Sequence, residues 1–317
     1  MIDLFFVCSL LSLNNAEQIY FRNILFSQIV PDSTIHNTNG LDSLISKDFK
    51  VEGSPSDFGP YLNPNTLVKL LQRKNISRDP DRDLAISIIE YLGVNPSGRI
   101  CGVPSLGRVV MDVESGIGCC SDYTKAWIFY ANYFGLQTRE VNTLNHNTVE
   151  YFDRYRNQWV WIDPYNRMEI LGPNKEPMNQ AQMRKETLFL ALEPSKLPGA
   201  SSRFDAKNYD GYAPAELSVL MWRKGTNFLT VEKWDARLRA WHVPKSIRQI
   251  VLLASGIAPH WLMLTTNAIA SYMRALQILL YLAAGILILI NSYLLGAVIY
   301  LLMGQFGQVH HPKSTHD

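Results

Sequence analysis

An uncharged, apolar segment near the C-terminus is the feature that most restricts how this chain can fold. Between Gln249 and Val309 the only Asp, Glu, Lys or Arg is Arg274, and the segment from Ala275 to Met303 carries no charge. As a helix this segment measures about 43 Å, more than the roughly 30 Å hydrocarbon core of a bilayer. Soluble helices seldom remain apolar on every face over such a length. We therefore expect a membrane-spanning helix and an integral membrane protein.

The segment before it, from Gln249 to Met273, is also uncharged, but it contains residues that lipid disfavours: Pro259, His260, Thr265, Thr266 and Asn267. Such residues are costly in lipid unless a neighbouring helix pairs with them. We expect this segment to form the first arm of a membrane hairpin that turns near Arg274. A single span preceded by a re-entrant or interfacial segment is the alternative.

Two further segments each allow two interpretations. Thr230 to Trp241 has apolar residues at helical spacing and basic residues elsewhere on the turn. It is either a helix at the lipid headgroups or a helix packed on the soluble domain. The apolar run from Leu4 to Leu13 is either a cleaved signal sequence or a strand or helix of the core.

Composition excludes several classes of protein. Charged residues make up 18% of the 317 residues, below the roughly 25% of soluble domains, and the net charge is only +2. A nucleic-acid-binding protein would have a basic excess, so we expect no nucleic acid among the partners. Four cysteines are too few and too irregularly spaced for a disulfide framework, and no C-x-x-C pair points to structural zinc. We expect no metal and no other cofactor.

The middle of the chain has the pattern of an α+β domain. Helices are predicted for Asp83 to Leu92 and for Tyr123 to Phe134, and a glycine follows each. Strands are predicted over residues 138–141, 146–152 and 159–162. The polar residues between the last two strands predict a hairpin.

The chain is accordingly divided into four regions. Residues 1–78 form an irregular or helical N-terminal region, and residues 79–197 form the core. Residues 198–248 contain a linker and the amphipathic helix, and residues 249–317 contain the membrane segment and a short tail.

Two neighbouring cysteines stand at the start of the second predicted helix. At this place the positive end of the helix dipole and free backbone N–H groups favour a thiolate for Cys119 or Cys120. A thiolate nucleophile also needs a base and a group that orients the base. His146 opens one predicted strand and Asp163 closes the next. A hairpin turn centred between residues 154 and 155 places these two directly opposite each other. The spacing therefore predicts a Cys–His–Asp constellation.

Three short motifs occur in order along this region: Gly118-Cys-Cys-Ser-Asp-Tyr123, His146-Asn-Thr-Val-Glu-Tyr151 and Trp159-Val-Trp-Ile-Asp-Pro164. Together they resemble the transglutaminase-like superfamily over roughly residues 80 to 170. The resemblance implies that Cys120 is the nucleophile, His146 the base and Asp163 the orienting carboxylate. It also implies an α+β, papain-like or transglutaminase-like core, in which the nucleophile helix packs against an antiparallel sheet.

Two positions depart from the family pattern. Thr148 stands where the family commonly has an aromatic residue. The neighbouring Cys119 leaves open which thiol attacks, although the motif favours Cys120.

The resemblance implies an enzyme that acts on amide bonds through a thioester acyl-enzyme. Peptide or amide hydrolysis, glutamine deamidation and acyl transfer all fit this chemistry. The expected partners are a protein or peptide with an amide group, the lipid bilayer and other membrane subunits. Two other classes stay open. One is a catalytically silent domain that serves as a scaffold or binding subunit of a membrane assembly. The other is a transporter or channel subunit, for which one or two spans make a poor pathway.

Basic residues predict which side of the membrane the catalytic domain faces. Arg237, Arg239, Lys245 and Arg248 precede the apolar region, and only Lys313 follows it. Because positive residues near a span mark the cytoplasmic side, we expect a cytoplasmic catalytic domain. Free-looking cysteines in the soluble core also suit a reducing compartment.

Overall fold

The computed structural model describes residues 22–31, 79–93, 106–143, 146–185, 193–198, 219–223, 228–258 and 260–308. The chain divides into two compact units, one formed by residues 26–270 and the other by residues 1–25 with 271–317. The first is an α+β unit with one large sheet, and the second contains most of a long apolar helix. The predictions for residues 4–13, 32–78 and 199–202 lie outside the described residues.

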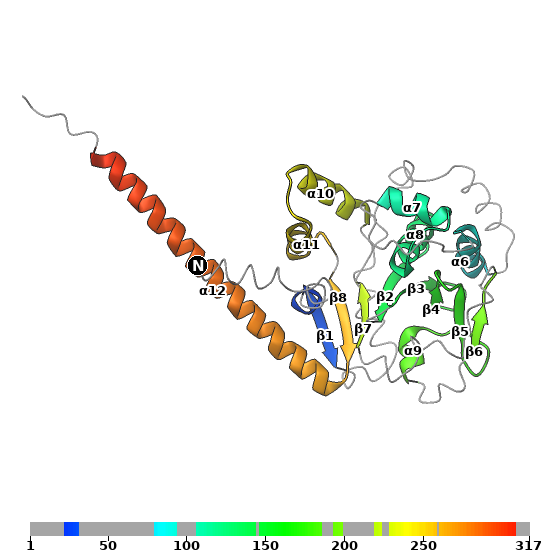
Figure 1. Ribbon diagram of the computed structural model, residues 1–317. Helices are drawn as coiled ribbons and strands as arrows, with labels where there is room; N and C mark the ends of the chain where they lie inside the picture. The colour runs from blue at the N-terminus through cyan, green and yellow to red at the C-terminus, as the bar shows by residue number, and fades with distance from the viewer. Residues whose placement is uncertain are drawn as a thin grey trace, which may run out of the picture. The chain divides into compact units, whose positions relative to one another are not determined.

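In the described part of the chain, eight strands form one sheet in the order β1-β8-β7-β2-β3-β4-β5-β6 (Figure 1). Neighbouring strands run antiparallel except for β1 and β8, which are parallel. The strands are β1 (Ser27–Pro31), β2 (Thr138–Thr143), β3 (His146–Asp153), β4 (Gln158–Asp163), β5 (Met168–Leu171), β6 (Glu193–Lys196), β7 (Val219–Arg223) and β8 (Trp261–Thr265).

Helix α8 is the centre of the hydrophobic core. It packs against α6, α7 and the strands β2 and β3. Trp127 of α8 and Tyr151 of β3 are both buried, with ring centroids 6.2 Å apart. The helices are α6 (Pro80–Tyr91), α7 (Leu106–Glu114), α8 (Cys120–Tyr133), α9 (Gln180–Lys185), α10 (Phe228–Ala240), α11 (Lys245–Ala254) and α12 (Asn267–Gln308).

The two predicted helices and three predicted strands are present, with ends shifted by a few residues. Both helices begin three residues earlier than predicted, and the shift of α8 matters most, because it begins at Cys120 rather than at Tyr123. Gly135 follows the last turn with a φ of 78°, a left-handed conformation that glycine adopts without strain and that ends helices. The sheet extends beyond the expected core, because β7 and β8 come from later in the chain and β1 from earlier.

The segment from Gln249 to Met273 does not form the first arm of a membrane hairpin. It contains the end of α11, then β8, then the first turns of α12. β8 lies between β1 and β7, and all five of its side chains are buried. A strand buried on both faces is a continuous apolar run, as is a membrane segment, so hydropathy alone does not separate the two.

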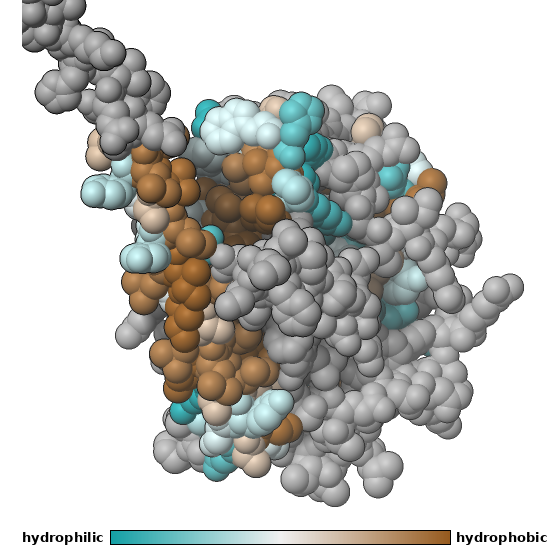
Figure 2. All heavy atoms as spheres, turned by 60° about the vertical axis from the view of Figure 1, so that its left-hand side comes forward, coloured by the Kyte–Doolittle hydropathy of each residue, from teal (hydrophilic) through white to brown (hydrophobic). Residues whose placement is uncertain are grey.

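Among the described residues, α12 is the one helix long and apolar enough to cross a membrane. Ala270 and Met273 in its first turns are buried, but most of its other apolar side chains are exposed and form a continuous hydrophobic band (Figure 2). Its early turns contact the chain before β1, since Gln277 Nε2 donates to the carbonyl of Ile24 at 2.8 Å and the Tyr281 hydroxyl donates to that of Leu25 at 2.6 Å. The stretch beyond these contacts, residues 282–303, measures about 33 Å as a helix, close to the thickness of a hydrocarbon core.

The N-terminus of α6 is attached to the β3–β4 hairpin by the buried carboxylate of Asp81. This carboxylate accepts a hydrogen bond from the backbone N–H of Arg154 at 3.0 Å. It also accepts two from the Arg154 guanidinium, through Nε at 2.8 Å and through Nη2. Asp81 is 2% exposed, so these donors replace the water that it loses on folding.

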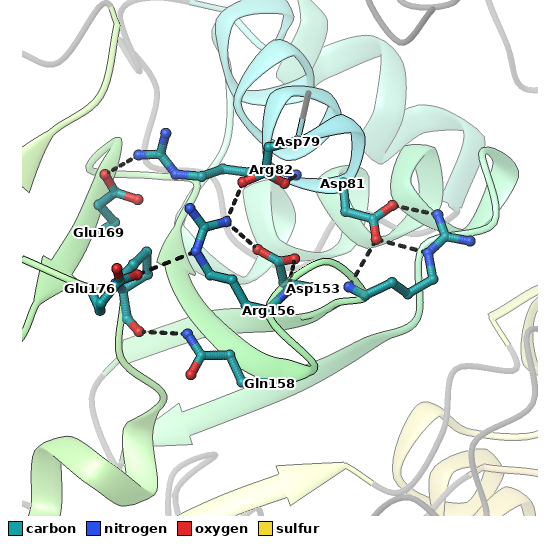
Figure 3. A network of polar contacts seen from close by, with 10 residues as sticks. Asp79, Asp81, Arg82, Asp153, Arg156, Gln158, Glu169 and Glu176 are labelled. Carbon is teal, nitrogen blue, oxygen red and sulfur yellow. Dashed lines mark hydrogen bonds and ion pairs between the residues drawn. The ribbon is translucent and has the colours of Figure 1, made fainter. Parts of the chain in front are cut away.

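A second arginine of the hairpin lies between several carboxylates (Figure 3). Arg156 contacts Asp79 at the start of α6, and its Nη1 is 2.7 Å from Asp153 Oδ2. Its Nε lies 3.4 Å from Oε2 of Glu176, a residue whose side chain is 66% exposed. The network joins α6 to the turn of the hairpin and thereby stabilises the strands that carry the site at their other ends.

We expect Asp81→Ala to lower the free energy of unfolding by about 1–3 kcal/mol, because it removes the acceptor of a backbone N–H in a partly buried place. Glu176→Ala is the matched control. It removes an exposed ion pair, for which we expect at most about 1 kcal/mol. Urea unfolding of the full-length protein in detergent, followed by circular dichroism, measures both. If the two variants lowered the free energy of unfolding equally, the stabilising role of the buried Asp81 carboxylate would be contradicted.

Candidate active site

The start of α8 is shaped by a cap and a glycine. Cys119 is the N-cap residue, and its backbone N–H donates to Oδ2 of the buried Asp122 at 3.2 Å. Gly118 has a φ of 150°, and a Cβ at this position would lie 3.2 Å from the Cβ of Asp122 and from Cγ2 of Val113. Only glycine fits this entry without strain. Cys120 thereby becomes the first residue of the helix, where the backbone N–H has no acceptor within the helix.

The two neighbouring cysteines differ in chemical state. Cys119 is disulfide-bonded, and Cys120 is a free, partly exposed thiol. The two remaining cysteines, Cys8 and Cys101, lie outside the described residues. The expectation of free cysteines throughout the soluble core is thus wrong for Cys119. A disulfide sulfur is not a thiolate nucleophile, and Cys120 is the free thiol at the helix start.

The register of the β3–β4 hairpin differs from the prediction. Val149 pairs with Ile162, and Asp153 with Gln158, so the turn is centred between residues 155 and 156. The predicted direct opposition of His146 and Asp163 is therefore wrong. A turn displaced by one residue moves each cross-strand partner by two, which keeps the side chains on the same face. His146 and Asp163 become diagonal neighbours, a separation that long side chains can bridge.

The two side chains are nevertheless in contact. Nε2 of His146 lies 2.7 Å from Oδ2 of Asp163. The His146 side chain is 14% exposed and the Asp163 side chain is fully buried. The imidazole thus contacts the buried carboxylate through Nε2, and only a small part of the ring is exposed to solvent.

The turn after β4 orients the Asp163 carboxylate. Oδ1 accepts the backbone N–H groups of Tyr165 at 2.9 Å and Asn166 at 3.0 Å, and Oδ2 accepts Nδ2 of Asn166 at 2.8 Å. The Tyr165 ring also packs edge-on against the imidazole of His146, with centroids 6.3 Å apart. The sequence prediction missed both residues. An aspartate followed by Pro-Tyr-Asn is an Asx-turn signal that would have indicated them.

Several groups act on the pKa of the Cys120 thiol. Burial raises this pKa, and the negative charge of Asp163 raises it further. The hydrogen bond with His146, the charge of the imidazolium and the backbone N–H of Asn147 lower it by more, so it lies below that of an ordinary cysteine. Asn147 is held against α8, because the Thr124 hydroxyl donates to its carbonyl at 3.0 Å.

The pKa of His146 changes in the opposite direction. Burial disfavours the imidazolium, but the Asp163 carboxylate and Cys120 favour it and raise the pKa to about 10. For Asp163, burial opposes ionisation, while His146 and Asn166 keep the pKa below its usual range. The three pKa shifts therefore favour a thiolate–imidazolium pair with a carboxylate behind it. The stability that protonated His146 contributes is complete below the ordinary histidine pKa and is lost as the pH rises through about 10.

Glu150, which lies in the second motif, has structural contacts. Glu150 and Arg139 form a fully buried ion pair at 2.5 Å, and Glu150 also accepts the backbone N–H of Gln180 at 2.6 Å. The Arg139 guanidinium lies 4.0 Å from the centroid of the Trp159 ring. This ion pair joins β2, β3 and the start of α9.

Thr148, the departure from the family pattern, is buried and accepts a hydrogen bond from Nε1 of Trp161 at 2.9 Å. It joins β3 to β4 within the sheet. Thr148 therefore gives the Trp161 indole a hydrogen-bond acceptor that an aromatic residue such as tryptophan or phenylalanine at this position would not provide.

Within the described ranges, no group of three or more His, Cys, Asp or Glu side chains is arranged to hold a metal ion. Cys101 lies outside these ranges, and so do His310 and His311. No protein-family model matches this chain, and no curated protein matches it in sequence.

The thiolate–imidazolium pair predicts how alkylation of Cys120 depends on pH. We expect iodoacetamide to modify Cys120 at a pH well below that needed for an ordinary cysteine. His146→Ala removes the hydrogen bond and the positive charge but leaves much of the burial, so the pH midpoint should rise. The measurement is the alkylation rate against pH by mass spectrometry of the peptide that contains Cys120. An unchanged midpoint in His146→Ala would show that the imidazole does not control the thiol.

Proposed function

We propose that this chain is a membrane-anchored, transglutaminase-like cysteine enzyme that acts on amide bonds through a thioester acyl-enzyme. One observation carries the proposal: the connected series from Cys120 at a helix start, through His146, to the buried carboxylate of Asp163. A reactive thiol with a base and an orienting acid is the arrangement that nucleophilic acyl transfer needs. The order of the three sequence motifs supports the same family.

The roles of the three side chains follow from their protonation states. The Cys120 thiolate attacks the carbonyl carbon of the amide, and the tetrahedral intermediate expels the amine. The His146 imidazolium gives its proton to the nitrogen of this leaving amine, and a thioester to Cys120 remains. Water or an amine then attacks the thioester and loses a proton to His146, and the thiolate is released. Asp163 keeps the ring in orientation and stays ionised throughout.

The start of α8 also supplies a group for the negative charge that develops on the carbonyl oxygen. The backbone N–H of Cys120 is at the first helical position, adjacent to its own sulfur. An oxygen bound there would accept this N–H and face the positive end of the helix dipole. The expected substrate is therefore a protein or peptide amide, either a backbone amide or a glutamine side chain.

A catalytically silent scaffold is the second candidate. The observation that favours it is the row of exposed apolar side chains on α12, which other membrane subunits could contact. A binding domain has no need for a lowered thiol pKa, because a thiolate beside an imidazolium contributes reactivity rather than packing. We therefore rank the enzyme first.

Labelling with a peptide fluoromethyl ketone tests the catalytic proposal. The full-length protein should form one covalent adduct, and Cys120→Ala should abolish it. Asp163→Asn should slow labelling by on the order of 10²- to 10⁴-fold, the range of general acid–base effects, because the ring loses its orienting anion. Cys119→Ala is the matched control: it changes the neighbouring cysteine and should still label. Adduct formation that persists in Cys120→Ala would overturn the assignment.

The side of the membrane is a separate proposal. The expectation of a cytoplasmic domain depended on free cysteines and on basic residues near the span. Cys119 is disulfide-bonded, and disulfides persist in oxidising compartments. The basic residues from Arg237 to Arg248 belong to α10 and α11, and β8 separates them from α12. Counted from the start of α12 at Asn267, Arg248 alone falls within the roughly 15–20 residues that the positive-inside rule counts, and the other three lie farther away. We propose that the catalytic domain faces the exported, oxidising side.

Protease protection distinguishes the two orientations. With protease outside intact cells, the catalytic domain should be digested, while an epitope placed after Asp317 should be protected as the internal control. A non-reducing gel should also show faster migration of the wild type than of Cys119→Ala, because the disulfide compacts the denatured chain. A domain protected in intact cells and digested only in inverted vesicles would restore the cytoplasmic orientation.

A further inference from the structure

α10 and α11 form a helical pair whose mutual angle is held by one aspartate. Oδ1 of Asp235 accepts Nε of Arg248 at 2.8 Å, and Oδ2 accepts Nη2 of Arg239 at 2.8 Å. Arg248 also donates to the carbonyl of Val243, in the connection between the helices, at 2.8 Å. Asp235 thereby joins α10 to α11 through Arg248.

The outer face of α11 is apolar. Ile247, Ile250, Val251 and Ala254 follow one another at the spacing i, i+3, i+4 and i+7, so they form one stripe on the helix. All four are exposed, with Ile247 at 49%. Leu252 and Leu253, on the opposite side, are the residues that α11 buries. An exposed apolar stripe of this regularity is unusual for a surface in contact only with water.

The outer face of α10 combines tryptophans with basic residues. Trp241 is 70% exposed and Trp234 is 36% exposed. The Arg237 guanidinium lies 4.9 Å from the centroid of the Trp234 ring, and Lys233 is exposed on the same turn. The exposed charged side chains of the two helices are all positive: Lys233, Arg237 and Lys245. The two acids of α10, Glu232 and Asp235, are half-buried, and Asp235 is paired with two arginines.

We propose that the outer faces of α10 and α11 bind the headgroup region of an anionic lipid bilayer. Tryptophan rings and basic side chains prefer the headgroup level, and an apolar stripe beside them enters the boundary with the acyl chains. Exposed positive charges complement anionic lipid headgroups. The same chain carries α12, which follows α11 after the intervening strand β8 and is long enough to cross a bilayer, so the two helices are tethered near a membrane. The proposal does not depend on the chemistry of Cys120.

Quenching of tryptophan fluorescence by brominated lipid tests this contact in the full-length protein. The protein is reconstituted into phosphatidylcholine–phosphatidylglycerol vesicles with brominated or plain acyl chains. The emission of Trp241 is the difference between wild type and Trp241→Phe, and we expect brominated lipid to remove most of it. The difference for Trp159→Phe is the control, since Trp159 is 2% exposed within the sheet and should not be quenched.

Two surface variants sharpen the test. Ile247→Ser with Ile250→Ser removes half of the apolar stripe and should restore Trp241 emission in brominated vesicles. Met111→Ser on α7 removes another exposed apolar side chain, 55% exposed, and should leave the quenching unchanged. Labelling of Cys120 verifies that each variant is folded.

Lipid composition separates this contact from a contact between proteins. Quenching should weaken in vesicles of phosphatidylcholine alone and at high salt, because both remove the attraction between basic side chains and headgroups. Trp241 emission that is equal in brominated and plain vesicles would overturn the proposal. The proposal would also fail if Trp241 emission changed with protein concentration but not with the bromination of the lipid. That result would assign the face to a second copy of the chain.

Discussion

The buried carboxylate of Asp163 is the group on which the arrangement of the candidate site depends. A charge that is fully buried is stable only when polar partners replace its water, and three N–H donors from the following turn together with His146 do so. This requirement closes the turn after β4 and draws the start of β3 toward it. The same carboxylate raises the pKa of His146, and the protonated ring lowers the pKa of the Cys120 thiol. The lowered pKa of the Cys120 thiol thus follows, through His146, from the buried Asp163 carboxylate.

The start of α8 separates two adjacent cysteines into different roles. Cys119 lies at the cap, outside the helical conformation, and is disulfide-bonded, whereas Cys120 lies within the first turn and is free. The left-handed backbone at Gly118 and the buried Asp122 make this division possible, because they determine where the helix begins. Electrostatics at a helix start favours an anion at either residue. The position of the cap determines that Cys120 lies in the first turn of the helix and Cys119 outside it.

The local sequence pattern predicted the helices and strands of the core closely. Two of its predictions, the centre of the hairpin turn and the membrane arm, were wrong for identifiable physical reasons. The hairpin turn was placed one residue too early, because the polar residues between β3 and β4 allow more than one centre. The error did not separate His146 from Asp163, since a displacement of two positions preserves the face of a strand. The interpretation of Gln249 to Met273 as a membrane arm failed for another reason. β8 is shielded from water by the sheet and not by lipid, and a side chain in either environment has the same apolar character.

By itself the sequence determined the features that arise from neighbours along the chain: the helix behind Cys120, the strands that carry His146 and Asp163, and the apolar length of α12. These follow from periodicity, capping and hydropathy, which act over a few residues. Only the tertiary structure decided which cysteine is bonded, that the Tyr165 ring packs against His146, and that β1, β7 and β8 complete the sheet. Those features depend on contacts between segments far apart in the chain or on the exact register of a turn. Burial creates these contacts, and no local pattern encodes it.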